Sequence, residues 1–119
     1  MKKTLILGAT TNTTRYSYLV ANKLVRKGHS IVNVGRKVGE VAGVTIEPAE
    51  TIHTDIDTIT MYVGPQNQAP YYDYILQTNP KRVIFNPGSE NPDLQQKLEQ
   101  AGIEIIEGCT LVMLNTGQF

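Results

Sequence analysis

The feature that most constrains the fold is a short apolar run near the start of the chain that breaks at a glycine. Residues 5–7 are apolar, Gly8 and Ala9 follow, and threonines with one asparagine fill positions 10–14 before an amphipathic segment begins. This order predicts a buried parallel strand, a tight turn and a helix. We therefore expect an α/β fold.

The predicted turn is suited to an anion. Backbone N–H groups of the turn and of the first helical turn converge at the carboxyl end of the strand, where they favour a phosphate. Small side chains at Gly8 and Ala9 allow a ligand to approach, and Thr10, Thr11 and Asn12 offer hydroxyl and amide groups. We expect a phosphate-bearing ligand, and a strand–helix turn without a ligand is the alternative.

The turn lacks the glycines of a dinucleotide-binding fingerprint. In the Gly-Ala-Thr-Gly-x-x-Gly variant of that fingerprint, the second and third glycines would stand where this chain has Thr11 and Thr14. A bulkier turn fits poorly under a pyrophosphate that joins two nucleosides. A standard NAD site is therefore disfavoured.

The rest of the chain alternates between apolar runs and amphipathic segments. We expect one domain over residues 1–119, a doubly wound, Rossmann-like parallel sheet of five strands in the order 3-2-1-4-5, and helices on both faces. Residues 38–51 read as a loop because glycine and proline interrupt them. The other four strands are expected at 30–34, 57–63, 82–85 and 103–106, and the helices at 17–28, 67–79 and 91–102.

Two cations follow the second predicted strand. NAD-binding domains usually carry an acidic residue here for the ribose hydroxyls, whereas this chain has Asn33 and then Gly35, Arg36 and Lys37. Arg36 and Lys37 suit a phosphate on the adenosine ribose, as in coenzyme A (CoA) or NADP. The alternative is that they are two exposed bases on a surface loop.

No acid–base group is expected on the edge of the sheet where ligands bind. His29 and His53 precede strands, which places them on the opposite rim, as it does Asp55 and Asp57. We predict neither catalytic residues nor a metal site. Cys109 follows the last strand, and it is either a buried filler or a thiol that forms a mixed disulfide with CoA.

The overall composition limits the partners. The 119 residues include 11 basic and 11 acidic residues, so the net charge gives no reason to expect binding to nucleic acid or to an anionic membrane. No apolar run approaches the ~20 residues of a membrane span. Too few apolar residues precede Gly8 to form the apolar region of a signal peptide. We expect a cytoplasmic protein.

The apolar residues 111–114 either pack under the sheet or form a dimer contact.

The first loop carries a resemblance to a known family. Gly8, Ala9, Thr10 and Arg15 match its usual Gly-Ala-Ser-x-x-x-x-Arg with Thr for Ser, and the chain resembles the small stand-alone CoA-binding proteins. These are similar to the N-terminal CoA-binding domain of the succinyl-CoA synthetase alpha subunit. The resemblance implies that residues 8–12 and Arg15 hold the pyrophosphate.

The resemblance also implies roles for the later loops. Residues 35–37 would lie near the phosphorylated ribose, and residues 62–65 would border the adenine or the pantetheine arm. After the fourth strand the family tends to Gln-x-Gly, where this chain has Asn86-Pro87-Gly88. With the rim positions, the predicted binding residues are Gly8, Ala9, Thr10, Thr11, Asn12, Arg15, Gly35, Arg36, Lys37, Tyr62, Val63, Pro65, Asn86 and Gly88.

Two functions remain open from the sequence. The first is non-catalytic binding of CoA or an acyl-CoA as a small-molecule ligand. The alternative is an NADP-linked or acyl-CoA-processing enzyme that needs a partner subunit. Ligase activity does not carry over from the synthetase, which needs a phosphorylated histidine on another domain. A homo-oligomer or a partner subunit is compatible with either function.

Overall fold

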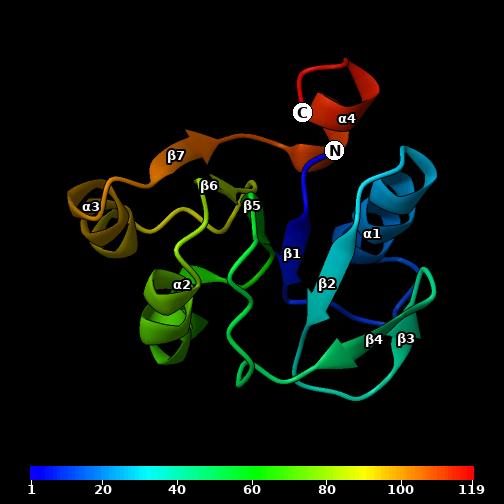
Figure 1. The fold of residues 1–119 in the computed structure, drawn as a ribbon, viewed down its shortest axis with the longest axis horizontal. Coiled ribbons are helices and arrows are strands. Elements are labelled where there is room, and N and C mark those ends of the chain that lie inside the picture. The colour runs from blue at the N-terminus through cyan, green and yellow to red at the C-terminus, as the bar shows by residue number, and fades with distance from the viewer.

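A computed structural model describes residues 1–119 as one mixed sheet with helices on both faces (Figure 1). The sheet has seven strands in the order β3-β4-β2-β1-β5-β6-β7. All neighbouring strands are parallel except β3 and β4, which form an antiparallel pair. The strands are β1 (Thr4–Leu7), β2 (Ile31–Val34), β3 (Glu40–Val41), β4 (Val44–Glu47), β5 (Thr58–Met61), β6 (Arg82–Phe85) and β7 (Glu104–Glu107).

The expected count of five strands and the expected order are wrong. The segment read as a loop contains the β3–β4 hairpin, and β4 takes the place beside β2 that was assigned to the strand at 57–63. That strand is β5, and it lies on the other side of β1. The six parallel strands therefore follow the order 3-2-1-4-5-6 that doubly wound dinucleotide-binding sheets also have.

A tight turn explains why the hairpin was missed. Ala42 and Gly43 both have positive φ, 54° and 80°, which is the backbone of a two-residue hairpin turn. The side-chain amide of Asn33 donates to the carbonyl oxygens of Val41 and Val44 at 3.1 and 3.0 Å, holding the turn against β2. The glycine that suggested a loop is part of this turn.

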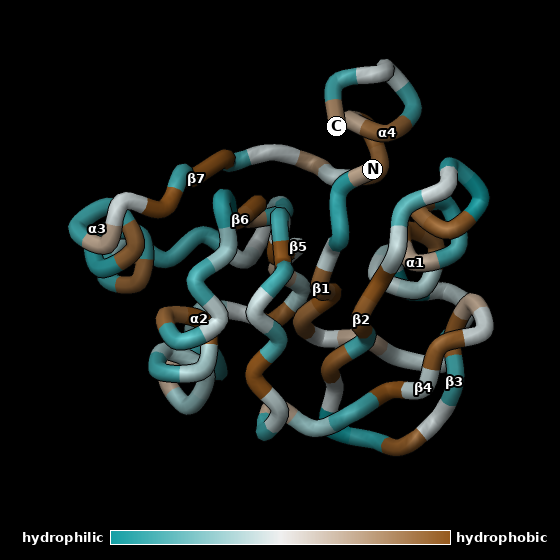
Figure 2. The backbone as a smooth tube through the Cα atoms, viewed as in Figure 1, coloured by the Kyte–Doolittle hydropathy of each residue, from teal (hydrophilic) through white to brown (hydrophobic).

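Helices cover the two faces of the sheet in pairs. The helices α1 (Tyr16–Arg26) and α4 (Thr110–Asn115) cover one face, and α2 (Tyr72–Thr78) and α3 (Pro92–Gln100) cover the other. Two short 3₁₀ turns, η1 (Pro65–Asn67) and η2 (Ala69–Tyr71), lead into α2. Figure 2 shows apolar stretches along the strands and in the helices. Each face thus has its own apolar core.

The last segment packs on the rest of the chain. Residues 111–114 lie in α4, and the side chain of Leu114 is buried with the core under α1. Past α4, the Phe119 main-chain oxygen accepts hydrogen bonds from Lys2 Nζ and, at 3.0 Å, from Arg82 Nη2. Leu114 therefore packs under the sheet, whereas Val112 of the same segment is exposed. None of the helices has the length and hydropathy needed to cross a bilayer.

Candidate functional site

The candidate site lies where the strand order changes direction. The chain passes from β1 to β2 on one side and returns to β5 on the other side of β1, and ligands of such sheets bind outside the carboxyl ends at this point. Gly8 leaves β1 with a φ of +101°, and a Cβ atom there would lie 2.9 Å from the carbonyl carbon of Tyr62. The exits of β1 and β5 are therefore in close contact, and this contact requires glycine.

Two of the expected backbone donors are already used. The N–H groups of Gly8 and Ala9 both donate to the carbonyl oxygen of Val34 at 2.9 Å, which ties the loop to the end of β2. The N–H groups of Thr10, Thr11 and Thr13 make no hydrogen bond within the chain. The backbone donors open to an anion thus begin at position 10.

The loop shapes itself with its own side chains. The Thr10 hydroxyl oxygen accepts from the Asn12 N–H at 3.1 Å, and the Asn12 side-chain oxygen accepts from the N–H and hydroxyl of Thr14 at 3.0 and 2.7 Å. Helix α1 then begins at Tyr16 without a side-chain cap from Arg15. Because no side chain caps the helix, the N–H groups of Tyr16 and Ser17 stay open as well, whereas that of Tyr18 donates to the Arg15 carbonyl oxygen at 3.1 Å.

A second loop is pressed onto the first. A Cβ atom at Gly35 would lie 2.4 Å from the carbonyl oxygen of Ala9, and one at Gly39 would lie 2.5 Å from Thr11 Cγ2. On the other side, the Gly35 N–H donates to the Glu47 carbonyl at 3.0 Å, and Gly39 accepts from the Ile46 N–H at 2.8 Å. Residues 35–39 are therefore held between β4 and the loop after β1.

This packing places cations without protein partners beside the loop after β1. Arg36 and Lys37 lie between the two glycines, and both are exposed. Neither side chain forms an ion pair or a hydrogen bond with the protein, and the same is true of Arg15. The edge therefore combines open backbone donors with free cations, which suits a ligand with several negative charges.

The loop after β5 forms a neighbouring wall. Tyr62 is half-buried beside Gly8, and burial raises the pKa of its hydroxyl well above the ordinary value. The Val63 carbonyl accepts from Gln68 Nε2 at 2.8 Å, and the same nitrogen donates to Ser89 at 2.7 Å. Pro65 is exposed and begins η1. The fully buried Gln68, which the sequence analysis missed, therefore ties the loop after β5 to the loop after β6.

Asn86 and Gly88 are engaged within the protein. Asn86 Nδ2 donates to Thr60 Oγ1 and to the Met61 carbonyl at 2.8 and 2.9 Å, and its Oδ1 accepts from the Thr110 N–H at 2.9 Å. The Gly88 N–H donates to the Glu90 carboxylate at 2.8 Å. The Asn86 side chain thus joins β5, β6 and α4.

The two histidines lie at opposite edges. His29 is at the amino edge, where its Nδ1 accepts from the Lys2 N–H at 3.1 Å and its ring packs 5.1 Å from that of Phe119. The expectation that His53 also lies there is wrong. His53 Nε2 is 3.0 Å from a carboxylate oxygen of Glu47, the residue that ends β4 at the carboxyl edge.

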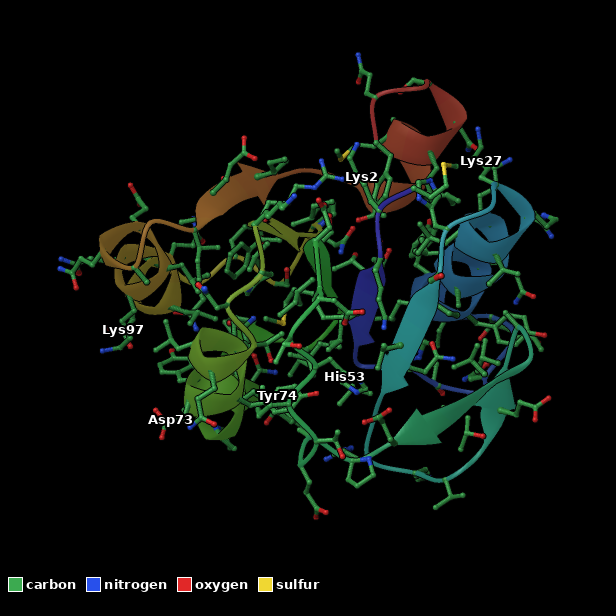
Figure 3. The ribbon with its side chains drawn as sticks, viewed as in Figure 1. Lys2, Lys27, His53, Asp73, Tyr74 and Lys97 are labelled. Atoms are coloured by element: carbon green, nitrogen blue, oxygen red, sulfur yellow. The ribbon has the colours of Figure 1, made fainter.

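The chain path explains the error for His53. Residues 48–57 run back along the sheet without a helix, so a residue five positions before β5 is still near the end of β4. Figure 3 shows His53 near Tyr74 of α2, far from Lys2 and Lys27. Burial, with a smaller contribution from the Glu47 charge, raises the pKa of Tyr74 to about 12. The sequence analysis missed the pair of Glu47 and His53 at this edge.

Comparisons with known proteins agree with this arrangement. A family profile described as "CoA binding domain" matches residues 2–115. A solved structure described as an uncharacterized protein is 55% identical, with a TM-score of 0.97, and the match covers 100% of this chain and 98% of that one. No curated protein matches this chain.

More distant structures share the fold. The "cell-free ID.343" protein from Thermus thermophilus is 20% identical over 99% of this chain and 90% of its own, with a TM-score of 0.87. A conserved hypothetical protein from Pyrococcus furiosus is 25% identical over 94% and 98%, with a TM-score of 0.80. The profile match over nearly the whole chain identifies it: this protein belongs to the CoA-binding domain family.

Proposed function

We propose that the protein binds CoA or an acyl-CoA without catalysing a reaction on it. The open N–H groups of Thr10, Thr11 and Thr13, together with Arg15, would hold the pyrophosphate. Arg36 and Lys37 would hold the phosphate on the ribose. Gly8, Ala9 and Gly35 would serve by allowing close approach of the backbone, because their own N–H groups are already bonded.

One observation carries this proposal. The contacts of Gly35 with Ala9 and of Gly39 with Thr11 fix the loop that bears the cations against the loop that bears the open donors. A single ligand with two separated phosphate groups, such as CoA, matches two neighbouring sites for negative charge. A ligand with one phosphate would leave one of the two sites unused.

The remaining predicted residues would border the ligand. Tyr62, Val63 and Pro65 form the wall beside Gly8 and would face the adenine or the pantetheine arm. Asn86 would act indirectly by holding β5, β6 and α4 together, since its amide is engaged within the protein. Gly88 would contact the ligand only if the Glu90 carboxylate moved from its N–H group.

Calorimetric titration with CoA and with 3'-dephospho-CoA tests the proposal. Charge-assisted contacts are worth about 1.5–3 kcal/mol, so removing the ribose phosphate should weaken binding by about 10- to 100-fold. The Arg36→Gln/Lys37→Gln variant should bind both ligands with similar affinity. Lys97→Gln, on the distant helix α3, is the matched control and should still discriminate. Equal affinity of the unmodified protein for both ligands would refute the role of the two cations.

A second candidate is an acyl-CoA-processing or NADP-linked enzyme that requires a partner subunit. The observation in its favour is the 3.0 Å contact of His53 with Glu47 at the carboxyl edge, because such a pair can transfer protons. Release of free thiol from acetyl-CoA, lost in His53→Gln, would support this function. Enhanced NADPH fluorescence on binding would support the NADP-linked form, and absence of both signals would exclude the two forms for the chain alone.

A further inference from the structure

A groove between α1 and α4 lies outside the proposed CoA site. It has a volume of about 410 Å³, and it is bordered by one side of α1, from Tyr18 to Arg26, and by one side of α4. The helices α1 and α4 cover the same face of the sheet. The residues that line this α1–α4 groove are Tyr18, Leu19, Asn22, Lys23, Arg26, Leu111 and Asn115.

The floor of the groove is apolar and continuous with the core. Tyr18 and Leu111 are half-buried and pack on the core under α1. Leu19 is 41% exposed, and Val112, the neighbour of Leu111 on α4, is 55% exposed. A contiguous apolar patch with a polar rim is typical of a surface that binds another protein.

The rim of the groove is positively charged. Lys23 and Arg26 form no ion pair, and α1 and α4 contain no acidic residue. The first acidic residue of the chain is Glu40, so nothing in the preceding segment balances these cations. The rim formed by α1 therefore carries two positive charges without an ion-pair partner, although the net charge of the chain is zero.

The shape of the groove favours a protein segment over a membrane. A convex helix fills a hollow between two helices by packing its side-chain ridges into it, whereas a flat lipid surface contacts only the rim. Amphipathic helices bind such grooves through apolar residues spaced at i, i+3, i+4 and i+7. Lys23 and Arg26 would pair with acidic residues that flank this apolar face.

We infer that the α1–α4 groove docks an acidic amphipathic helix of a partner protein. The apolar face of that helix would cover Leu19, Leu111 and Val112, and its carboxylates would meet Lys23 and Arg26. This inference does not depend on the proposed binding of CoA, since none of the groove residues belongs to that site.

A designed peptide tests the docking surface. The probe is a fluorescent helix of about 18 residues, or about 27 Å, with leucines on one face and glutamates beside them. Fluorescence anisotropy with the full chain should show saturable binding, and Lys23→Glu/Arg26→Glu should weaken it by about tenfold or more. The Lys81→Glu/Lys97→Glu variant has the same change in net charge away from the groove, and it should bind the probe normally.

Further arms of the experiment separate the alternatives. A peptide with lysines in place of the glutamates should not bind, and ¹⁵N NMR should show the acidic probe shifting amides of α1 and α4 alone. CoA titration of Lys23→Glu/Arg26→Glu reports separately on the proposed function. If Lys23→Glu/Arg26→Glu bound the acidic probe as tightly as the unmodified protein does, the inference would be overturned. Binding only to phosphatidylcholine vesicles with about a third phosphatidylserine would assign the surface to a membrane and overturn it too.

Discussion

At the scale of single residues, Gly35 is the position on which the candidate site depends most. Its Cβ atom would lie 2.4 Å from the Ala9 carbonyl oxygen, so Gly35→Ala must push the two loops apart. Overpacking of this kind costs about 1–3 kcal/mol. We expect that loss in the free energy of unfolding by urea denaturation, with a loss of CoA affinity measured by calorimetry.

The matched control is Gly108→Ala. A Cβ atom there has no neighbour closer than 3.7 Å, and the residue has no positive φ. This substitution should change the free energy of unfolding by less than about 0.5 kcal/mol. If the two substitutions had the same effect on stability and on CoA binding, the close contact of the loops would not be what matters.

At the scale of elements, the turn of the β3–β4 hairpin contains a strained residue, and a substitution there could relieve the strain. Ala42 has a φ of 54°, a conformation that suits asparagine better than alanine. Ala42→Asn would create the Asn-Gly sequence that two-residue hairpin turns favour. We expect a gain of about 0.5–1 kcal/mol in the free energy of unfolding, with an unchanged urea m-value.

The same substitution at an ordinary position provides the comparison. Ala101 follows α3 with a φ of −86°, so Ala101→Asn relieves no strain and should not stabilise the protein. CoA binding should be unaffected in both variants. A loss of stability in Ala42→Asn would show that the turn does not have the conformation described above.

The sequence predicted this part of the fold unevenly. It located the strand, turn and helix around Gly8 because the apolar run and the small residues are local signals. It missed the hairpin because β3 has only Glu40 and Val41, and the turn signal at Gly43 resembles that of a loop. Because β4 was missed, the strand at 57–63 was assigned to the place beside β2, and the predicted order of the strands was therefore wrong.

The family could be predicted from the sequence, but several contacts that shape the candidate site could not. The family and the cationic loop followed from residues close together in the sequence. The engagement of the Gly8 and Ala9 N–H groups by Val34 depends on the pairing of two strands, which no local pattern shows. The contact of His53 with Glu47 depends on the path of a long connection. The spacing of Gly35 and Gly39 around the cations was the signal that could have revealed the contact between the loops.

At the scale of the whole molecule, the amino edge predicts how stability depends on pH. Burial is the main reason that the pKa of His29 lies below 6.5, its ordinary value. The unfolded chain therefore binds a proton more readily, and stability is lost as the pH falls from about 6.5 through the lower pKa of the folded protein. We expect His29→Gln to reduce the pH dependence of the free energy of unfolding in that range, as measured by urea denaturation. An identical pH profile would contradict the assignment.

The central claim is that one ligand contacts both loops at the carboxyl edge. A ¹⁵N NMR titration with CoA tests it most directly, because each backbone N–H group is observed separately. We predict that the amides of Thr10, Thr11 and Thr13 shift together with that of Lys37 at one dissociation constant, and that Gly8 and Ala9 shift less because they are bonded to Val34. Shifts confined to one loop, or an unperturbed loop at saturating CoA, would contradict the account.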